Sequence, residues 1–74
     1  MNPFSKWFGL PGEARVTFGP GEYKVVIPGD FVRCAVTGAT ILLPDLRYWS
    51  VELQEAYVSA EASTQRYRER HRRK

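Results

Sequence analysis

The sequence predicts an α+β fold that is mostly β: a small antiparallel β meander followed by one C-terminal helix. Short stretches of alternating apolar and polar residues are separated by turns rich in glycine and proline, and the end of the chain has the capping and charge pattern of a helix. A chain of 74 residues forms one domain, and its 43% of hydrophobic residues suffices for a folded core.

Alternation and turn residues predict about four to six short strands. In the second strand Tyr23, Val25 and Ile27 are expected to share one face, because successive side chains of a strand point to opposite sides. In the fifth strand Trp49 is expected in the core and Tyr48 at its margin, since a small sheet needs large aromatic side chains. The strands are expected at residues 14–18, 23–27, 31–36, 40–43, 47–51 and 55–58.

A helix is predicted over residues 60–71. Ser59 is a suitable N-cap residue, and Glu61 is favourable in the first turn because of the helix dipole. The apolar face of this segment is thin, so Tyr67 is expected to hold the helix against the body. The domain organisation that follows is an aromatic N-terminal arm at 1–10, a single β-rich domain at 11–65, and a basic tail at 66–74 whose helix end frays.

The single cysteine lies in a turn, Cys34-Ala-Val-Thr-Gly38, that has the shape of a zinc knuckle whose second cysteine is Thr37. The other pair of ligands in a treble-clef site would fall at Val58 and Ala62, which cannot bind zinc. Two hypotheses remain: a metal-free hairpin of treble-clef or zinc-ribbon type, and a plain hairpin with a buried cysteine. Neither holds a metal or another cofactor.

The sequence favours a non-enzymatic protein. A buried apolar setting is expected to raise the pKa of the Cys34 thiol and make it inert, and the only histidine, His71, lies in the tail. No glycine loop that could cradle a phosphate precedes a helix. Scattered carboxylates are usually solvated, so no catalytic residue is assigned.

The last nine residues hold six of the eleven basic residues of the chain and one acid, whereas the rest of the chain is slightly acidic. Such a tail can neutralise phosphates, and Tyr67 within it can stack on a base. The alternative is a solvated helix end, since cations near a helix C-terminus complement its dipole. The candidate nucleic-acid contacts are Arg66, Tyr67, Arg68, Arg70, Arg72, Arg73 and Lys74.

The N-terminal arm carries Phe4, Trp7 and Phe8 ahead of the patterned body. Exposed aromatic residues of this kind mark an interface, so the arm is a candidate for self-association into a homodimer. The chain shows no signal-peptide pattern and no apolar stretch near the roughly 20 residues of a membrane span. A cytoplasmic protein without a membrane segment is expected.

A long part of the sequence resembles a bacterial family known as domain of unknown function 2093. The resemblance rests on PG-x-FV-x-CAVTG, then LRYWSV and QEAY, and covers about Leu10 to Ala62. It implies a small bacterial protein with no assigned activity, cofactor or site residue. We therefore expect a non-enzymatic interaction module that self-associates through the arm or an open sheet edge. The alternative is a nucleic-acid-binding accessory protein that uses the basic tail, and the identity of any protein partner stays open.

Overall fold

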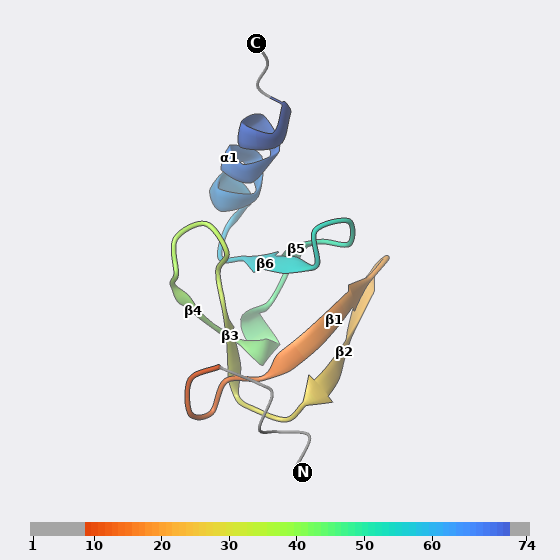
Figure 1. Ribbon diagram of the computed structural model, residues 1–74, viewed down its shortest axis with the longest axis vertical. Helices are drawn as coiled ribbons and strands as arrows, with labels where there is room; N and C mark the ends of the chain where they lie inside the picture. The colour runs from red at the N-terminus through yellow and green to blue at the C-terminus, as the bar shows by residue number, and fades with distance from the viewer. Residues whose placement is uncertain (1–8, 72–74) are drawn as a thin grey trace.

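The computed structural model describes residues 9–71 and confirms a mostly β fold with one C-terminal helix. Figure 1 shows the strands gathered in the body and the helix beyond them. A short 3₁₀ turn over Leu43–Asp45 separates the fourth and fifth strands. The elements are β1 (Arg15–Gly19), β2 (Glu22–Ile27), β3 (Phe31–Arg33), β4 (Thr40–Leu42), β5 (Tyr48–Ser50), β6 (Glu55–Tyr57) and α1 (Ala60–His71).

The six strands pair two by two in chain order, as three antiparallel hairpins β1–β2, β3–β4 and β5–β6. Single backbone hydrogen bonds join the hairpins. The Ala14 N–H donates to the Phe31 carbonyl at 2.7 Å, and the Ala35 N–H donates to the Ala56 carbonyl at 2.9 Å. Two-stranded sheets are marginal by themselves, so these links and the shared core hold the hairpins together.

The core lies where the three hairpins and the start of α1 meet. Trp49 reaches it from β5, stacks on Phe18 with ring centroids 5.9 Å apart, and meets Tyr23 edge to face at 5.7 Å. Its indole N–H donates to the Gly19 carbonyl at 3.0 Å, and Trp49 is partly buried against the core rather than enclosed in it. The buried residues include Ala14, Phe18, Val32, Cys34, Ile41, Leu46, Ala56, Tyr57 and Ala62.

The β1–β2 ladder contains one irregularity. Val16 pairs with Val25, but Arg15 pairs with Ile27, so Val26 has no partner in the ladder. An extra residue of this kind breaks the alternation of sides. Val25 is 46% exposed and Val26 is 53% exposed. Tyr23 and Val25 lie in the regular part of the ladder and share a face as expected, but the irregularity interrupts the alternation before Ile27.

Gly29 lies where the chain passes from β2 to β3. A Cβ atom built at this position would approach the Ala14 nitrogen to 2.4 Å and the Gly12 oxygen to 2.6 Å. The neighbouring Asp30 N–H donates to the same Gly12 carbonyl at 2.8 Å. The β2–β3 connection therefore packs directly on the backbone of residues 12–14.

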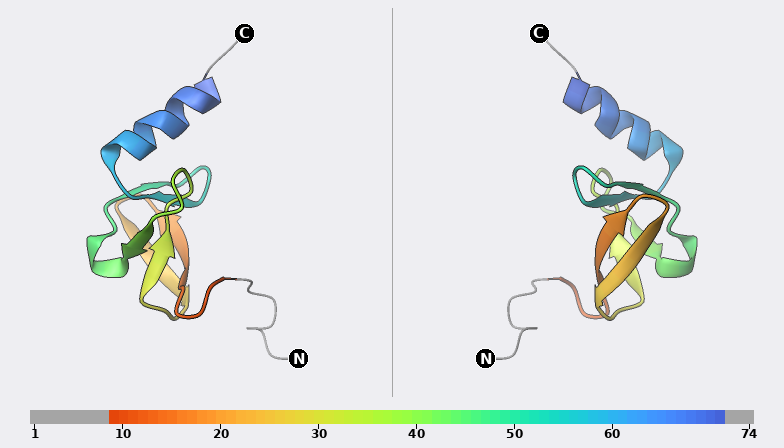
Figure 2. Two further views of the ribbon diagram at one scale, coloured as in Figure 1. Left: turned by 90° about the vertical axis from the view of Figure 1, so that its left-hand side faces the viewer. Right: turned by 90° about the vertical axis from the view of Figure 1, so that its right-hand side faces the viewer.

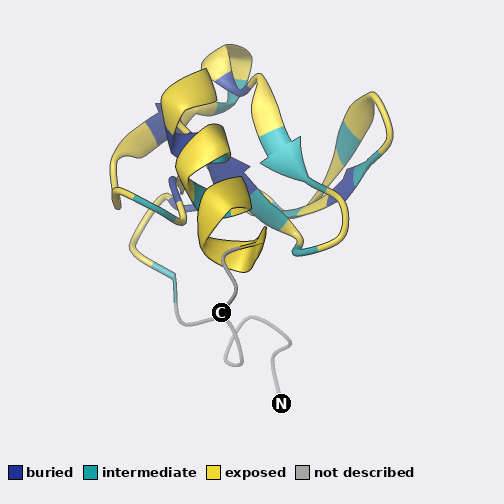
Figure 3. Ribbon diagram, turned by 90° about the horizontal axis from the view of Figure 1, so that it is seen from above, coloured by how far each residue is buried: buried dark blue, intermediate teal, exposed yellow. Residues whose placement is uncertain are grey.

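Helix α1 has the predicted bounds and begins at the predicted cap, since the Ser59 hydroxyl accepts the Ala62 N–H at 3.1 Å. It projects away from the hairpins in both views of Figure 2. Its only buried residue is Ala62, and Figure 3 shows its surface almost entirely exposed. Tyr67 is 63% exposed, so the expectation that it holds the helix is wrong. No helix within residues 9–71 is long and apolar enough to cross a membrane.

Candidate functional site

The turn after β3 folds around the Cys34 side chain. The Gly38 N–H donates to the Cys34 carbonyl at 2.9 Å, and Gly38 has a φ of +79°, a conformation in which a side chain would be strained. The Thr37 N–H donates to the Cys34 sulfur at 3.4 Å. Cys34 is 3% exposed, which confirms that the thiol is buried.

Hydrogen bonds make this buried thiol more acidic. Burial alone would raise its pKa, but the Thr37 hydroxyl and the N–H groups of Thr37, Val58 and Val36 stabilise the thiolate. The pKa of Cys34 is lowered overall, so the expected upward shift is wrong. The groups that hydrogen-bond the sulfur are backbone amides and a hydroxyl, and none of them can act as a base.

The Val58 amide brings the residues before α1 against the sulfur of Cys34. The treble-clef hypothesis has four ligand positions. Three of them, at Cys34, Thr37 and Val58, therefore lie together around the Cys34 sulfur. The Thr37 hydroxyl accepts the Ala39 N–H at 3.2 Å and so takes part in the turn itself. Among the described residues no three His, Cys, Asp or Glu side chains are grouped as metal ligands would be. Descent of this turn from a zinc knuckle stays a hypothesis.

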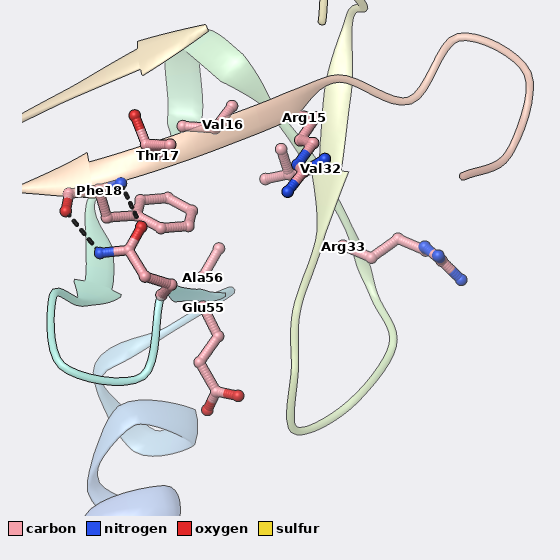
Figure 4. Close-up of a pocket in the computed structure, with 9 residues that line it drawn as sticks. Arg15, Val16, Thr17, Phe18, Val32, Arg33, Glu55 and Ala56 are labelled. Carbon is pink, nitrogen blue, oxygen red and sulfur yellow. Dashed lines mark hydrogen bonds between the residues drawn. The ribbon is translucent and has the colours of Figure 1, made fainter. Parts of the chain in front are cut away.

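A groove of about 380 Å³ runs beside the edge of β1 that faces away from β2 (Figure 4). Phe18, Val32 and Ala56 form its apolar floor, and Arg33 lies at one end, where its guanidinium pairs with Glu13 at 3.0 Å. The groove is short, because a side chain from the β5–β6 turn closes its other end.

That side chain belongs to Gln54. Its amide donates to the Phe18 carbonyl at 2.8 Å and accepts the Phe18 N–H at 2.9 Å, the two dashed lines of Figure 4. The Gln54 side-chain amide therefore makes the two hydrogen bonds to Phe18 that the backbone of a paired strand would make. Gln54 also has a φ of +56°, and no other described residue except glycine has a positive φ. The role of Gln54 was not predicted from the sequence, because its contact with Phe18 joins positions 36 residues apart.

The other side of the β1–β2 sheet has no paired strand within residues 9–71. Strand β2 pairs with β1 alone, and β1 lies between β2 and the remaining strands in Figure 1. Val25 and Val26 are exposed next to one another on this strand. We call the outer side of β2 at these two residues the β2 edge. An open sheet edge was expected from the sequence, but neither the strand nor the residues that form it were predicted.

The basic residues of α1 are partly engaged within the chain. The Nε atom of Arg66 lies 2.9 Å from the Glu55 carboxylate, and its Nη2 atom donates to the Ala35 carbonyl at 3.1 Å. The Tyr57 hydroxyl donates to the same carboxylate at 2.9 Å. Burial, this hydrogen bond and the charge of Glu55 raise the pKa of Tyr57. Arg66 therefore joins helix, turn and hairpin.

The next turn of α1 faces the β5–β6 turn across a cleft of about 360 Å³. Arg70 crosses it, with its Nη1 atom 2.9 Å from the Glu52 carboxylate. Tyr67 stacks on His71 with ring centroids 4.0 Å apart, and both line the cleft. Arg68, which is exposed, has no ion-pair partner among the described residues.

The remaining predicted site residues lie outside residues 9–71. They are Phe4, Trp7 and Phe8 of the arm and Arg72, Arg73 and Lys74 of the tail. Of the predicted nucleic-acid contacts, the structure brings Arg66, Tyr67 and Arg70 to one cleft and leaves Arg68 apart from it.

These features define a small β-rich domain with two open surfaces, the β2 edge and the cleft beside α1. The chain belongs to a family described as uncharacterized protein conserved in bacteria (DUF2093), whose sequence profile matches residues 25–66. This confirms the resemblance seen in the sequence. The match runs from β2 into α1 and includes the Cys34 turn and the β5–β6 hairpin. No curated protein and no solved structure is significantly similar to the chain.

Proposed function

We propose that this protein is a small non-enzymatic interaction module of the bacterial cytoplasm that self-associates through the β2 edge. The observation that carries the proposal is the exposure of Val25 and Val26 side by side on a strand whose outer side is unpaired within residues 9–71. An unpaired strand is a template for association with another chain, and exposed apolar groups favour burial against a partner.

Two features of β2 limit how two copies of the chain can meet at the β2 edge. Lys24 is exposed on the same strand, and the ladder irregularity at Val26 bends the edge; both discourage a long continuous sheet between copies. The contact is therefore made chiefly by the valine side chains. A two-fold dimer is the expected product, because one patch then meets its own copy and no surface remains for further growth.

We also infer a role without catalysis from the surroundings of Cys34 in the described part of the chain. The thiol is buried, and its hydrogen-bond partners are Thr37 and backbone amides. A cysteine nucleophile needs an adjacent base or an accessible thiolate. The aromatic arm of Phe4, Trp7 and Phe8 stays a second prediction for the same self-association.

Light scattering on a sizing column tests the proposal over a wide range of protein concentrations. The wild-type chain should give the mass of a dimer at high concentration, and a variant with Val25→Ser and Val26→Ser should remain a monomer. The matched control is Val51→Ser with Val58→Ser, which changes two valines exposed to a similar degree, at 45% and 41%. The control should dimerise as the wild type does.

Three outcomes count against the β2 edge. A wild-type monomer at every concentration would remove self-association altogether. Equal dimerisation of the β2 variant and the control would place the contact elsewhere. The third outcome concerns a variant with Trp7→Ala and Phe8→Ala. If it is a monomer while the Val25→Ser and Val26→Ser variant is a dimer, self-association belongs to the arm.

A further inference from the structure

The cleft between α1 and the β5–β6 turn combines groups that suit a nucleic acid. Arg70 supplies a guanidinium, and Tyr67 supplies an aromatic ring that is 63% exposed. Arginine pairs with phosphate, and an exposed tyrosine gives a base a surface on which to stack. His71 stacks on the Tyr67 ring, with the two ring centroids 4.0 Å apart.

In the free protein the guanidinium of Arg70 is occupied by Glu52, whose side chain is 76% exposed. Ion pairs that are this exposed contribute little, so a phosphate can displace the carboxylate at small cost. Arg66 differs, because its partner Glu55 is half-buried and also accepts the Tyr57 hydroxyl. Arg66 therefore stays in place while Arg70 is released.

We propose that this cleft binds single-stranded nucleic acid, with a phosphate on Arg70 and a base on Tyr67, and that Glu52 competes with the phosphate. Glu52 is then an internal inhibitor: its carboxylate must leave before the strand binds. Three further basic residues, Arg72, Arg73 and Lys74, follow α1 in the sequence and lie outside the described residues. This site is separate from the β2 edge, so neither proposal depends on the other.

An anionic membrane surface would be attracted by the same charges, but the aromatic group favours a nucleic acid. Membrane-bound helices of this kind present a broad apolar face to the lipid. In α1 the only buried residue is Ala62, and the exposed surface is polar apart from Ala60 and Tyr67. A ring among arginines suits a base between phosphates.

Fluorescence anisotropy of a labelled single-stranded oligonucleotide of about 12 nucleotides tests the proposal on the full chain. Glu52→Gln should tighten binding about two- to five-fold beyond the effect of the matched control Glu22→Gln, which removes the same charge from an exposed site on β2. Tyr67→Ala should weaken binding several-fold more than Tyr48→Ala, another exposed tyrosine. Affinity should fall as salt concentration rises.

If Glu52→Gln and Glu22→Gln change the affinity for the oligonucleotide equally, the change in net charge explains both. Glu52 then does not compete with the phosphate for Arg70. No binding by either the wild type or Glu52→Gln at low salt would overturn the site. Binding to vesicles of anionic lipid with the same dependence on Glu52 and Tyr67, and weaker binding to the oligonucleotide, would assign the cleft to a membrane.

Discussion

At the scale of single residues, Cys34 combines two properties that usually exclude each other. It is buried, yet its pKa is lowered, because the turn of residues 34–38 and the amide of Val58 point hydrogen-bond donors at the sulfur. The sequence shows which residues can be buried but not where backbone amides point, so the burial was predictable and the direction of the pKa shift was not. Low exposure should make the thiol slow to react in the folded state despite its acidity.

The lowered pKa of Cys34 predicts a pH-dependent stability. The unfolded thiol titrates near 9.0 and the folded thiol below it, so the folded chain releases this proton first. The stability that Cys34 contributes is fully present above the pKa of the unfolded thiol. It is lost as the pH falls through the pKa of the folded thiol. Urea unfolding between about pH 7 and pH 9 should therefore show a stability that rises with pH more steeply in the wild type than in Cys34→Ala.

The control for this prediction removes one donor and keeps the thiol. Thr37→Val lacks the hydroxyl that stabilises the thiolate, so its slope should lie between those of the wild type and Cys34→Ala. Identical slopes in all three proteins would show that the native environment does not acidify Cys34.

For the elements, local signals in the sequence were sufficient for the position of the helix and of most strands, but not for the number of strands or for how they pair. Ser59 marks the start of α1, and glycine or proline turns mark the β1–β2 and β3–β4 hairpins, whereas the β5–β6 turn at residues 51–54 has neither residue. The third strand ends at Arg33, earlier than alternation predicts, because the chain then enters the Cys34 turn. The irregularity at Val26 could not be predicted, since only the pairing of two strands creates it, and the exposure of Val25 depends on which parts of β2 other elements cover.

Gln54 was missed for the same physical reason, and it carries the contact between two elements. Replacing it with alanine leaves the N–H and carbonyl of Phe18 without their partner. We expect Gln54→Ala to lower the free energy of unfolding by about 1–2 kcal/mol, measured by urea unfolding. The free energy of unfolding of Gln54→Glu should lie between those of the wild type and Gln54→Ala. A carboxylate still accepts a hydrogen bond from the Phe18 N–H but cannot donate one to the Phe18 carbonyl.

A glutamine on the surface of α1 provides the control. Gln65 bonds only to Glu69 on the same helix, so Gln65→Ala should change stability by less than about 0.5 kcal/mol. Equal losses at the two positions would mean that Gln54 is an ordinary surface residue and that the β5–β6 hairpin docks on β1 by other contacts.

At the scale of the whole molecule, three hairpins and a helix are held together by a small core and a few long-range polar contacts. Arg66 is the most connected of these, because it meets the Cys34 turn at Ala35, the β5–β6 hairpin at Glu55, and Glu69 on its own helix. A helix of this length is marginal by itself in water, and α1 buries only Ala62. The docking of α1 should therefore depend on Arg66.

Arg66→Ala is expected to lower stability by about 1–2 kcal/mol and to reduce the helix signal in circular dichroism before global unfolding. The matched control is Arg68→Ala on the exposed side of the same helix, which should stay within about 0.5 kcal/mol of the wild type. If both substitutions lower stability equally, loss of charge or of helix propensity is the cause and the bridging role of Arg66 is wrong.

The close approach at Gly29 has a consequence for how the chain tolerates change in evolution. Any side chain there meets backbone atoms of residues 12–14, which cannot move aside as a flexible side chain would. A substitution at position 29 must be accompanied by a shift of that segment, and hence of the start of β1. The two stretches are bound to vary together: a homologue without this glycine would carry an altered entry into its first hairpin.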